Sequence, residues 1–404
     1  MVTKFDTYQS IKLAIILLLI TNRNLFGDIG FLTFYIICVW YILRDGLYWP
    51  VFKYVAIIMF PILVGFVMGL PKHEMYDTFK DIYYFLSPVF TCYVGCIIAK
   101  RTSINVLKQA FLIVGIFMAI FYVFSVFIEV GMLALGDPRA ARYERDSSVS
   151  CAVFLSLGIL LWDVTSNSQT VKKQGVIYII LFLINLLAIY ISGSRTYWIT
   201  VLVFMGIVAW SYIKERLMRF IVIGIVTLIS IVMLLSANPN NTTVEVLLHS
   251  VEEMTEDDFS SSKKRNDNYR AYEAYRAMNQ FENYHIKNRI LGGGFGEKID
   301  MVISPIGIRY IPILHNAYPY ILIKVGYLGM ACFILFGLIL VRAMWKLRNI
   351  DDSDLKMFCY MAIGGVLATF IINASVWGLF NNAYNILLML SGIFIYYYNK
   401  EKFC

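Results

Sequence analysis

The chain has 404 residues, of which 59% are hydrophobic and only 15% are charged, and its formal net charge is +8. Soluble domains average about 45–50% apolar and about 25% charged residues. Continuous apolar runs recur along the chain, many of them long enough to cross a bilayer core about 30 Å thick. The composition therefore excludes an ordinary soluble domain. It predicts an all-α, polytopic membrane protein rather than a β-barrel, whose strands would alternate in polarity.

About twelve membrane spans are predicted along the chain. The first two are short and closely spaced, so they could instead form a re-entrant pair. The twelve apolar segments are 8–22, 28–43, 51–70, 82–99, 105–130, 149–165, 175–191, 197–213, 219–236, 315–341, 357–377 and 383–398. A long polar segment separates the ninth span from the tenth. This division predicts three parts: spans one to nine in 1–236, a loop subdomain in 237–314, and the last three spans with a tail in 315–404.

The distribution of basic residues predicts the orientation. If the spans alternate, the lysines and arginines of the short loops fall on one side of the membrane, which the positive-inside rule assigns to the cytoplasm. These residues are Lys100, Arg101, Lys172, Lys173, Lys214, Arg216, Arg219, Arg342, Lys346, Arg348, Lys400 and Lys402. The long loop is then external. The positive charge therefore reports topology, and no nucleic-acid partner is predicted.

The long loop contains one recognisable helix and one turn. A helix is predicted from about Asp267, with aromatic residues gathered on one face. The segment "GGGFG" at 292–296 follows. It is not preceded by a predicted strand, so it predicts a turn back toward the membrane and not a nucleotide site. The cysteines and histidines lack the spacing of a metal site, and neither a metal nor a cofactor is predicted.

Several arginines lie on the predicted external side, where basic residues should be rare. Arg195 is the most informative, because "SGSRTYW" places it in a tight turn between two apolar helices. A charge near the lipid is costly unless it faces a polar cavity or a partner. Snorkelling to the head groups is one interpretation. The other is an anion clamp, because a guanidinium group binds diphosphate oxygens in a bidentate way.

His315 is the second residue of the stretch "LHNAYPYILIKVGYLG" (314–329) and the first residue of the predicted tenth span. A histidine at a membrane boundary is most often an interfacial hydrogen-bonding residue. Its ring can also accept a proton from a hydroxyl near neutral pH and so act as a general base.

Three motifs give the chain a family resemblance. His315-Asn316, nine residues and then Gly326-Tyr327-Leu328-Gly329 fit an H-N-x9-G-x-x-G signature. "SGSRTYW" is similar to an external Ser-x-Ser-Arg turn, and "YRAYEAYRAMNQFENYHIKNRILGGGFG" resembles a loop arginine, helix and glycine-rich turn that precede the histidine. On these motifs the chain resembles the O-antigen ligase and Wzy-type polysaccharide polymerase superfamily of bacterial membrane glycosyltransferases.

The resemblance implies a GT-C-like fold and a metal-independent, inverting transfer on the external face of the bacterial inner membrane. The implied donor is an undecaprenyl-diphosphate-linked oligosaccharide; membrane lipids and a chain-length regulator are further candidate partners. By position, His315 would be the catalytic base, and Arg195 and Arg270 would hold the diphosphate, with Arg265 or Arg276 as alternatives to Arg270. The remaining candidate substrate-binding residues are Arg142, Asn316 and Tyr318.

The motifs leave the acceptor open. We favour a polymerase that joins lipid-linked repeat units, with a ligase that transfers the chain to lipid A core as the alternative. A lipid-linked sugar transporter or flippase is the alternative from another class. It would show internal repeats and charges at the bilayer midplane. No repeat is evident, and Lys324 is the main charge inside a late span.

Overall fold

The computed structural model describes residues 4–21, 23–138, 142, 144, 149–166, 169–194, 196–210, 259, 261, 265, 269–302, 307–346, 348–374, 378–380 and 382–403. Helices dominate these residues, so the all-α prediction is confirmed apart from one small ladder. Strands β1 (Ile299–Asp300) and β2 (Tyr310–Ile311) pair antiparallel within the segment predicted as the long loop.

Five described helices are long and apolar enough to cross a membrane. They are α3 (Trp49–Gly69), α4 (Met75–Arg101), α5 (Ile104–Val130), α15 (Ala317–Lys346) and α16 (Ser353–Ile372). Shorter apolar helices occupy Ala152–Thr165, Gly175–Ile191 and Thr196–Trp210. The protein is therefore a multi-pass membrane protein. The predicted span 219–236 lies outside the described residues, and the count of twelve spans stays a prediction.

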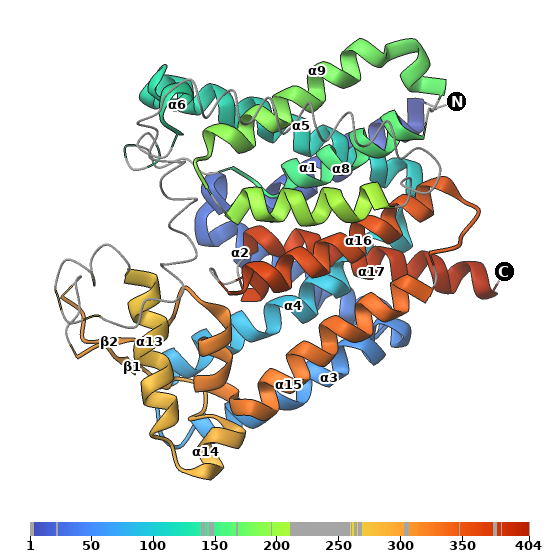
Figure 1. The fold of residues 1–404 in the computed structure, drawn as a ribbon. Helices are drawn as coiled ribbons and strands as arrows, with labels where there is room; N and C mark the ends of the chain where they lie inside the picture. The colour runs from blue at the N-terminus through green and yellow to red at the C-terminus, as the bar shows by residue number, and fades with distance from the viewer. Residues whose placement is uncertain are drawn as a thin grey trace.

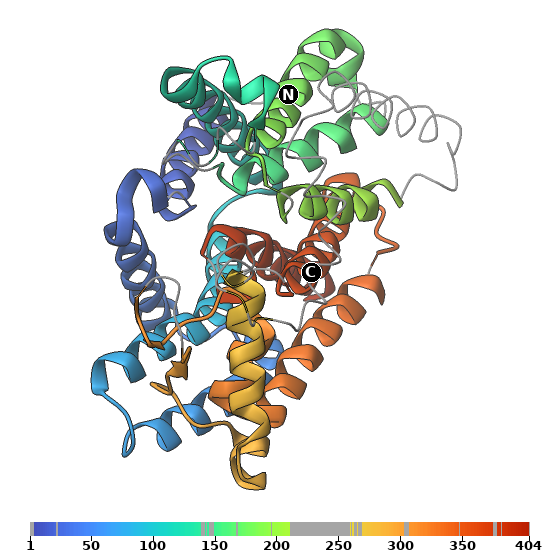
Figure 2. The same cartoon turned by 60° about the vertical axis from the view of Figure 1, so that its left-hand side comes forward.

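The long helices lie side by side and leave a small polar subdomain at one end (Figures 1 and 2). Helix α17 (Asn382–Phe403) packs against α4 and α16, and α15 packs against α3. Helix α5 packs against α1 (Lys4–Thr21), α8 (Ala152–Thr165) and α9 (Gln169–Ile191), while α2 (Arg23–Asp45) contacts α1 and α4. The short helix α6 (Leu133–Gly136) follows α5.

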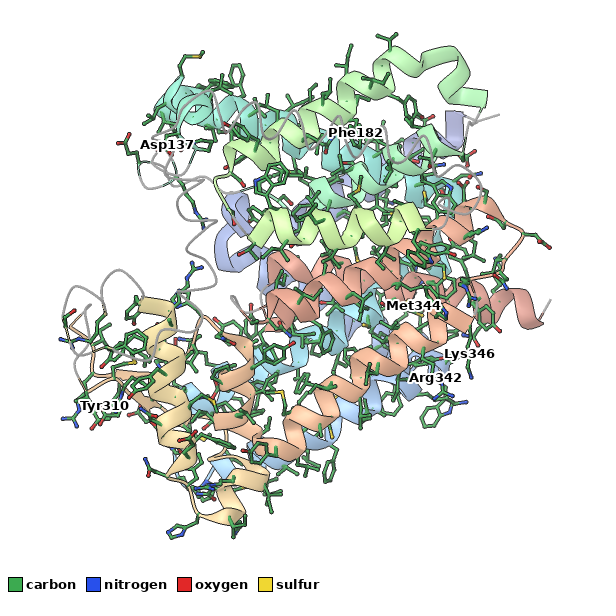
Figure 3. All side chains as sticks on the ribbon, in the orientation of Figure 1. Asp137, Phe182, Tyr310, Arg342, Met344 and Lys346 are labelled. Atoms are coloured by element: carbon green, nitrogen blue, oxygen red, sulfur yellow. The ribbon has the colours of Figure 1, made fainter. Side chains whose placement is uncertain are left out.

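The polar subdomain consists of α13 (Tyr269–Glu282), α14 (Ile286–Leu291), β1 and β2. We call the end of the helix bundle that carries it the loop end. Arg342 and Lys346 lie at the opposite end from Tyr310 of β2 (Figure 3). The predicted orientation places these two residues on the cytoplasmic side and the loop subdomain outside, and it stays a prediction.

Helix α13 confirms the amphipathic helix predicted from about Asp267. Its buried face carries Tyr272 and Phe281, and the Tyr272 ring packs against Phe259 at 5.3 Å between ring centroids. The Tyr272 hydroxyl donates to the Met301 carbonyl over 2.6 Å. Burial of an aromatic stripe stabilises such a helix more than intrinsic propensity does. The stripe thereby fixes α13 against the β ladder.

The glycine-rich turn inserts into a break in α15. Gly326 has φ 65° and ψ −166°, so the helix is interrupted there. The carbonyls of Ile323 and Lys324 accept hydrogen bonds from the N–H groups of Gly293 (2.8 Å) and Gly294 (3.2 Å). A Cβ atom on Gly326 would stand 2.4 Å from the Ile290 carbonyl oxygen. The first glycine of the G-x-x-G motif is therefore required by backbone conformation and by close approach.

Lys324 forms a buried ion pair next to this break. Its Nζ lies 2.6 Å from Oδ2 of Asp81 in α4, and the two side chains are 0% and 1% exposed. Asp81 also accepts hydrogen bonds from the Gly296 N–H (2.7 Å) and from the Tyr320 hydroxyl. Buried charges persist when they are paired and hydrogen-bonded. The pair ties α4, the glycine-rich turn and α15 into one unit.

An aromatic cluster surrounds this junction. The ring of Phe85 in α4 lies 4.8 Å from Phe295, 5.5 Å from Tyr320, 5.7 Å from Phe333 and 4.6 Å from Phe380, measured between centroids. Phe380 ends the 3-10 helix η1 (Gly378–Phe380). Tilted and edge-on ring pairs add to the free energy gained by burial. The loop end is thus packed as a rigid platform for the segment that follows β2.

Candidate active site

His315 lies between β2 and the first residue of α15, at the loop end of the bundle. The two residues that follow α16 hold this segment: the Ala317 N–H donates to the Asn373 carbonyl (3.0 Å), and the Asn316 side-chain amide donates to the Ala374 carbonyl (2.7 Å). The His315 side chain is 50% exposed. Its backbone is therefore fixed while its ring remains accessible.

A carboxylate from α13 orients the His315 ring. Oε2 of Glu273 lies 2.8 Å from Nδ1 of His315 and also accepts the His315 backbone N–H over 3.1 Å. The Glu273 side chain is only 3% exposed. A carboxylate at Nδ1 favours the tautomer that carries its proton there, which leaves the lone pair on Nε2. The accessible side of the ring can then accept a proton.

Tyr269 completes this hydrogen-bonded group. Its ring meets the His315 ring edge-on, with 6.2 Å between centroids, and its hydroxyl hydrogen-bonds to Glu273. Burial raises the pKa of Tyr269, and the neighbouring Glu273 raises it further. The hydroxyl therefore stays protonated and donates to the carboxylate. Three donors to Glu273 offset the cost of burying its charge.

Asn316 and Tyr318, predicted to bind substrate, are engaged with protein groups. The Asn316 side-chain oxygen accepts the Tyr318 backbone N–H (3.0 Å), and the Tyr318 hydroxyl donates to the Phe370 carbonyl (2.6 Å). These contacts join the start of α15 to the end of α16. Both residues therefore help to position His315, and their contact with substrate stays a prediction.

The three loop arginines differ in their surroundings. Arg270 is exposed in the first turn of α13, three residues before Glu273, so the two share one turn of the helix. The Nε of Arg276 donates to the Asp300 carbonyl (3.1 Å) and so faces the β ladder. Arg265 is buried and donates to the Phe259 carbonyl (2.7 Å). Contact of any of these arginines with a ligand at His315 stays a prediction.

The other two candidate arginines belong to neighbouring connections. Arg195 lies outside the described residues, although Ser194 and Thr196 beside it are buried. Arg142 is exposed in the connection between α6 and α8, and it interacts electrostatically with Tyr197 in the helix after the Arg195 turn. The predicted convergence of Arg195 with His315 therefore stays a prediction.

Sequence reasoning missed Glu273, although a signal was present. Glu273 follows Tyr272 on the face of α13 that is otherwise apolar and aromatic, and both residues are buried. An acidic residue on the buried face of an amphipathic helix requires a hydrogen-bonding partner. That signal marks Glu273 as unusual, but it does not identify a histidine 42 residues further along the chain.

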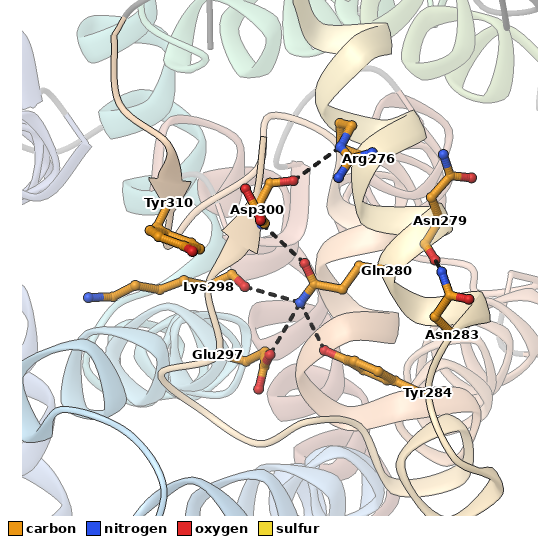
Figure 4. A pocket seen from close by; sticks show the side chains of 9 residues that line it. All are labelled: Arg276, Asn279, Gln280, Asn283, Tyr284, Glu297, Lys298, Asp300 and Tyr310. Atoms are coloured by element: carbon orange, nitrogen blue, oxygen red, sulfur yellow. Dashed lines mark hydrogen bonds between the residues drawn. The ribbon is translucent and has the colours of Figure 1, made fainter. Parts of the chain in front are cut away.

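A separate polar pocket of about 460 Å³ lies further along α13 (Figure 4). Side chains of α13, of the residues after it and of the β ladder line it. They are Arg276, Asn279, Gln280, Asn283, Tyr284, Glu297, Lys298, Asp300 and Tyr310. Gln280 lies at its centre, where its amide bridges the Lys298 carbonyl and the Asp300 N–H. The pocket does not include His315.

Fold and site together define a multi-pass helical membrane protein whose carboxylate-paired histidine lies where a polar loop subdomain meets the membrane helices. Residues 180–334 match the family model described as O-antigen ligase, so this segment carries that family's domain. The match includes His315 and both glycines of the G-x-x-G motif, and it confirms the resemblance to the O-antigen ligase and Wzy-type polymerase superfamily. No curated protein matches the chain. The family match supports a function of the O-antigen ligase or polymerase type.

Proposed function

We propose that the protein is a membrane glycosyltransferase that polymerises lipid-linked oligosaccharide repeat units into a surface polysaccharide. The donor is an undecaprenyl-diphosphate-linked chain, and the acceptor is a sugar hydroxyl of another lipid-linked unit. The observation that carries this proposal is the Glu273–His315 pair, half open at the loop end, within the segment that matches the family. The site faces the periplasm or the exterior, and the protein resides in the bacterial inner membrane.

The proposed reaction is a single displacement at the anomeric carbon. Nε2 of His315 accepts the proton of the acceptor hydroxyl while its oxygen attacks the anomeric carbon of the donor, and the bond from that carbon to the diphosphate oxygen breaks. The configuration at the anomeric carbon inverts. Glu273 stabilises the imidazolium that forms, as a buried carboxylate beside a catalytic histidine does in other enzymes. The imidazolium then returns its proton to solvent.

The leaving lipid diphosphate requires positive charge, because negative charge develops on its bridging oxygen. Fixed guanidinium groups supply such stabilisation without reorganising during the reaction. We assign this role to Arg270 and Arg195, with Arg142 contributing. The exposed position of Arg270 within one turn of Glu273 supports its part in this assignment.

We expect Glu273→Gln to lower kcat at least about tenfold while changing KM for the lipid donor little. The amide keeps the size of the side chain and can still accept the His315 backbone N–H, but it removes the charge that stabilises the imidazolium. Glu273→Asp, which keeps the charge, should recover part of the rate. Steady-state kinetics on purified protein in nanodiscs measure both parameters. An unchanged kcat in Glu273→Gln would contradict the positioning role.

Transfer to lipid A core is the second candidate function. The observation in its support is that the matching family model is described as O-antigen ligase. The glycans of a deletion strain separate the two functions. Loss of a polymerase should leave single repeat units on the acceptor lipid, whereas loss of a ligase should leave long chains that are not attached to it. We expect single repeat units, and unattached long chains would replace the polymerase assignment with the ligase.

The contacts of Lys324 account for its charge without a transport pathway. Ionisable residues inside membrane proteins pair with one another or with backbone carbonyls, or they line a polar cavity. Lys324 is fully buried, pairs with Asp81, and donates to the Glu297 carbonyl. Its charge is used to hold the loop end together.

A further inference from the structure

The pocket on α13 has no part in the reaction proposed for His315, and its lining is chemically distinctive. Three side-chain amides belong to it, from Asn279, Gln280 and Asn283. An amide offers both donors and an acceptor, which matches hydroxyl groups that themselves donate and accept. Tyr310 adds a phenol ring to the rim, and this side chain is about half exposed at 51%. An aromatic ring can pack against the apolar face of a sugar ring while the hydroxyl groups of the sugar remain hydrated.

The charged side chains that line the pocket are balanced in sign, and two of them, Lys298 and Asp300, are already in ion pairs. Lys298 lies 2.7 Å from Asp77, and Arg309 donates to both carboxylate oxygens of Asp300 over 3.0 Å. Arg309 lowers the pKa of Asp300 to about 2, so this carboxylate stays ionised at physiological pH. Arg276 and Glu297 contribute one charge of each sign. A pocket whose charges are balanced in this way does not select an anion, and it suits a neutral polyhydroxyl ligand.

The pocket lies on the same helix as the partner of His315. Glu273 and Gln280 are seven residues apart in α13, which places them two turns or about 10 Å apart on nearly the same face. A short oligosaccharide can span that separation. A chain whose reacting sugar lies at His315 would therefore reach the pocket with sugars further along the same chain.

We propose that this pocket is a glycan-binding subsite that holds non-reacting sugars of the polysaccharide chain. The inference rests on the proposed function for the class of its ligand. Gln280 positions the lining through its own hydrogen bonds to protein groups (Figure 4). Asn279 and Tyr310, which also line the pocket, would then contact the sugars. The subsite retains the chain near the membrane surface between transfers.

Binding of oligosaccharides to the full-length protein in nanodiscs tests this proposal. The probe is the set of repeat-unit oligosaccharides released by mild acid from the surface polysaccharide of the source strain. We expect Asn279→Ala combined with Tyr310→Ala to weaken binding about tenfold, since two ligand contacts are lost. Asn279→Ala alone should weaken it less, and this single change on a helix surface preserves the fold. Tyr76→Ala, which removes a tyrosine that is 74% exposed in α4, is the matched control and should bind as the wild type does.

His315→Ala distinguishes failure of the subsite from failure of the proposed function. This variant should bind the oligosaccharides with wild-type affinity and should not transfer sugar. Wild-type affinity in the doubly substituted Asn279 and Tyr310 protein would overturn the subsite, whatever the activity of His315→Ala. Transfer by His315→Ala would overturn the reaction assigned to His315 without affecting the binding result.

Discussion

His315→Ala is expected to lower the rate of glycosyl transfer by about 10²–10⁴, the usual contribution of a general base. The substitution removes the Nε2 acceptor but leaves the hydrogen bonds of the Asn316 side-chain amide and the Ala317 backbone N–H to the residues that follow α16. The protein should therefore insert in the membrane in normal amount. Glycan analysis of a deletion strain complemented with this variant should show the phenotype of the empty strain.

His285→Ala provides the matched control. His285 is exposed before α14 and its side chain makes no capping hydrogen bond, so the same chemical change is made in the same subdomain. This variant should restore the polysaccharide fully. Full restoration by His315→Ala at equal membrane abundance would refute the assignment of His315 as the base.

Lys324→Met is expected to destabilise the folded protein by about 3–5 kcal/mol, because it leaves Asp81 as a buried charge without its cation. The Gly296 N–H and the Tyr320 hydroxyl would still donate to Asp81, but neither supplies a positive charge. Unfolding of the purified protein in mixed micelles, followed by tryptophan fluorescence, measures the loss.

The double variant Asp81→Asn with Lys324→Met should be more stable than Lys324→Met alone, since it removes the uncompensated charge. Replacing a buried ion pair by neutral groups often costs less than breaking it. Wild-type stability in Lys324→Met would show that the pair does not hold α4 and α15 together.

The sequence predicted the local elements of the site well because their signals are local. The aromatic periodicity of α13 predicts its buried face, and the glycine run at 292–296 predicts the turn that the structure has. The histidine motif drew attention to His315, which lies at a junction between a polar loop and an apolar helix, and its catalytic role stays a prediction. The structure adds the reason for Gly326, which is the entry of the glycine-rich turn into α15.

The partners of the charged groups could not be predicted, because they depend on packing between segments far apart in the chain. Lys324 was recognisable as an unusual charge within an apolar run, but its partner Asp81 lies in α4, at the edge of a span predicted to begin at 82. Glu273 is one of several acidic residues in the loop. Hydrophobic periodicity specifies which face of a helix is buried, and it carries no information on which distant residue that face contacts.

The central claim is that the Glu273–His315 pair drives transfer from a lipid diphosphate donor. The most direct measurement uses purified protein in nanodiscs with a lipid-diphosphate-linked repeat unit, and it follows free lipid diphosphate and new glycosidic linkages together. The wild type should release one lipid diphosphate for each linkage formed, and His315→Ala should form neither above background. Linkage formation by His315→Ala at the wild-type rate would contradict the account.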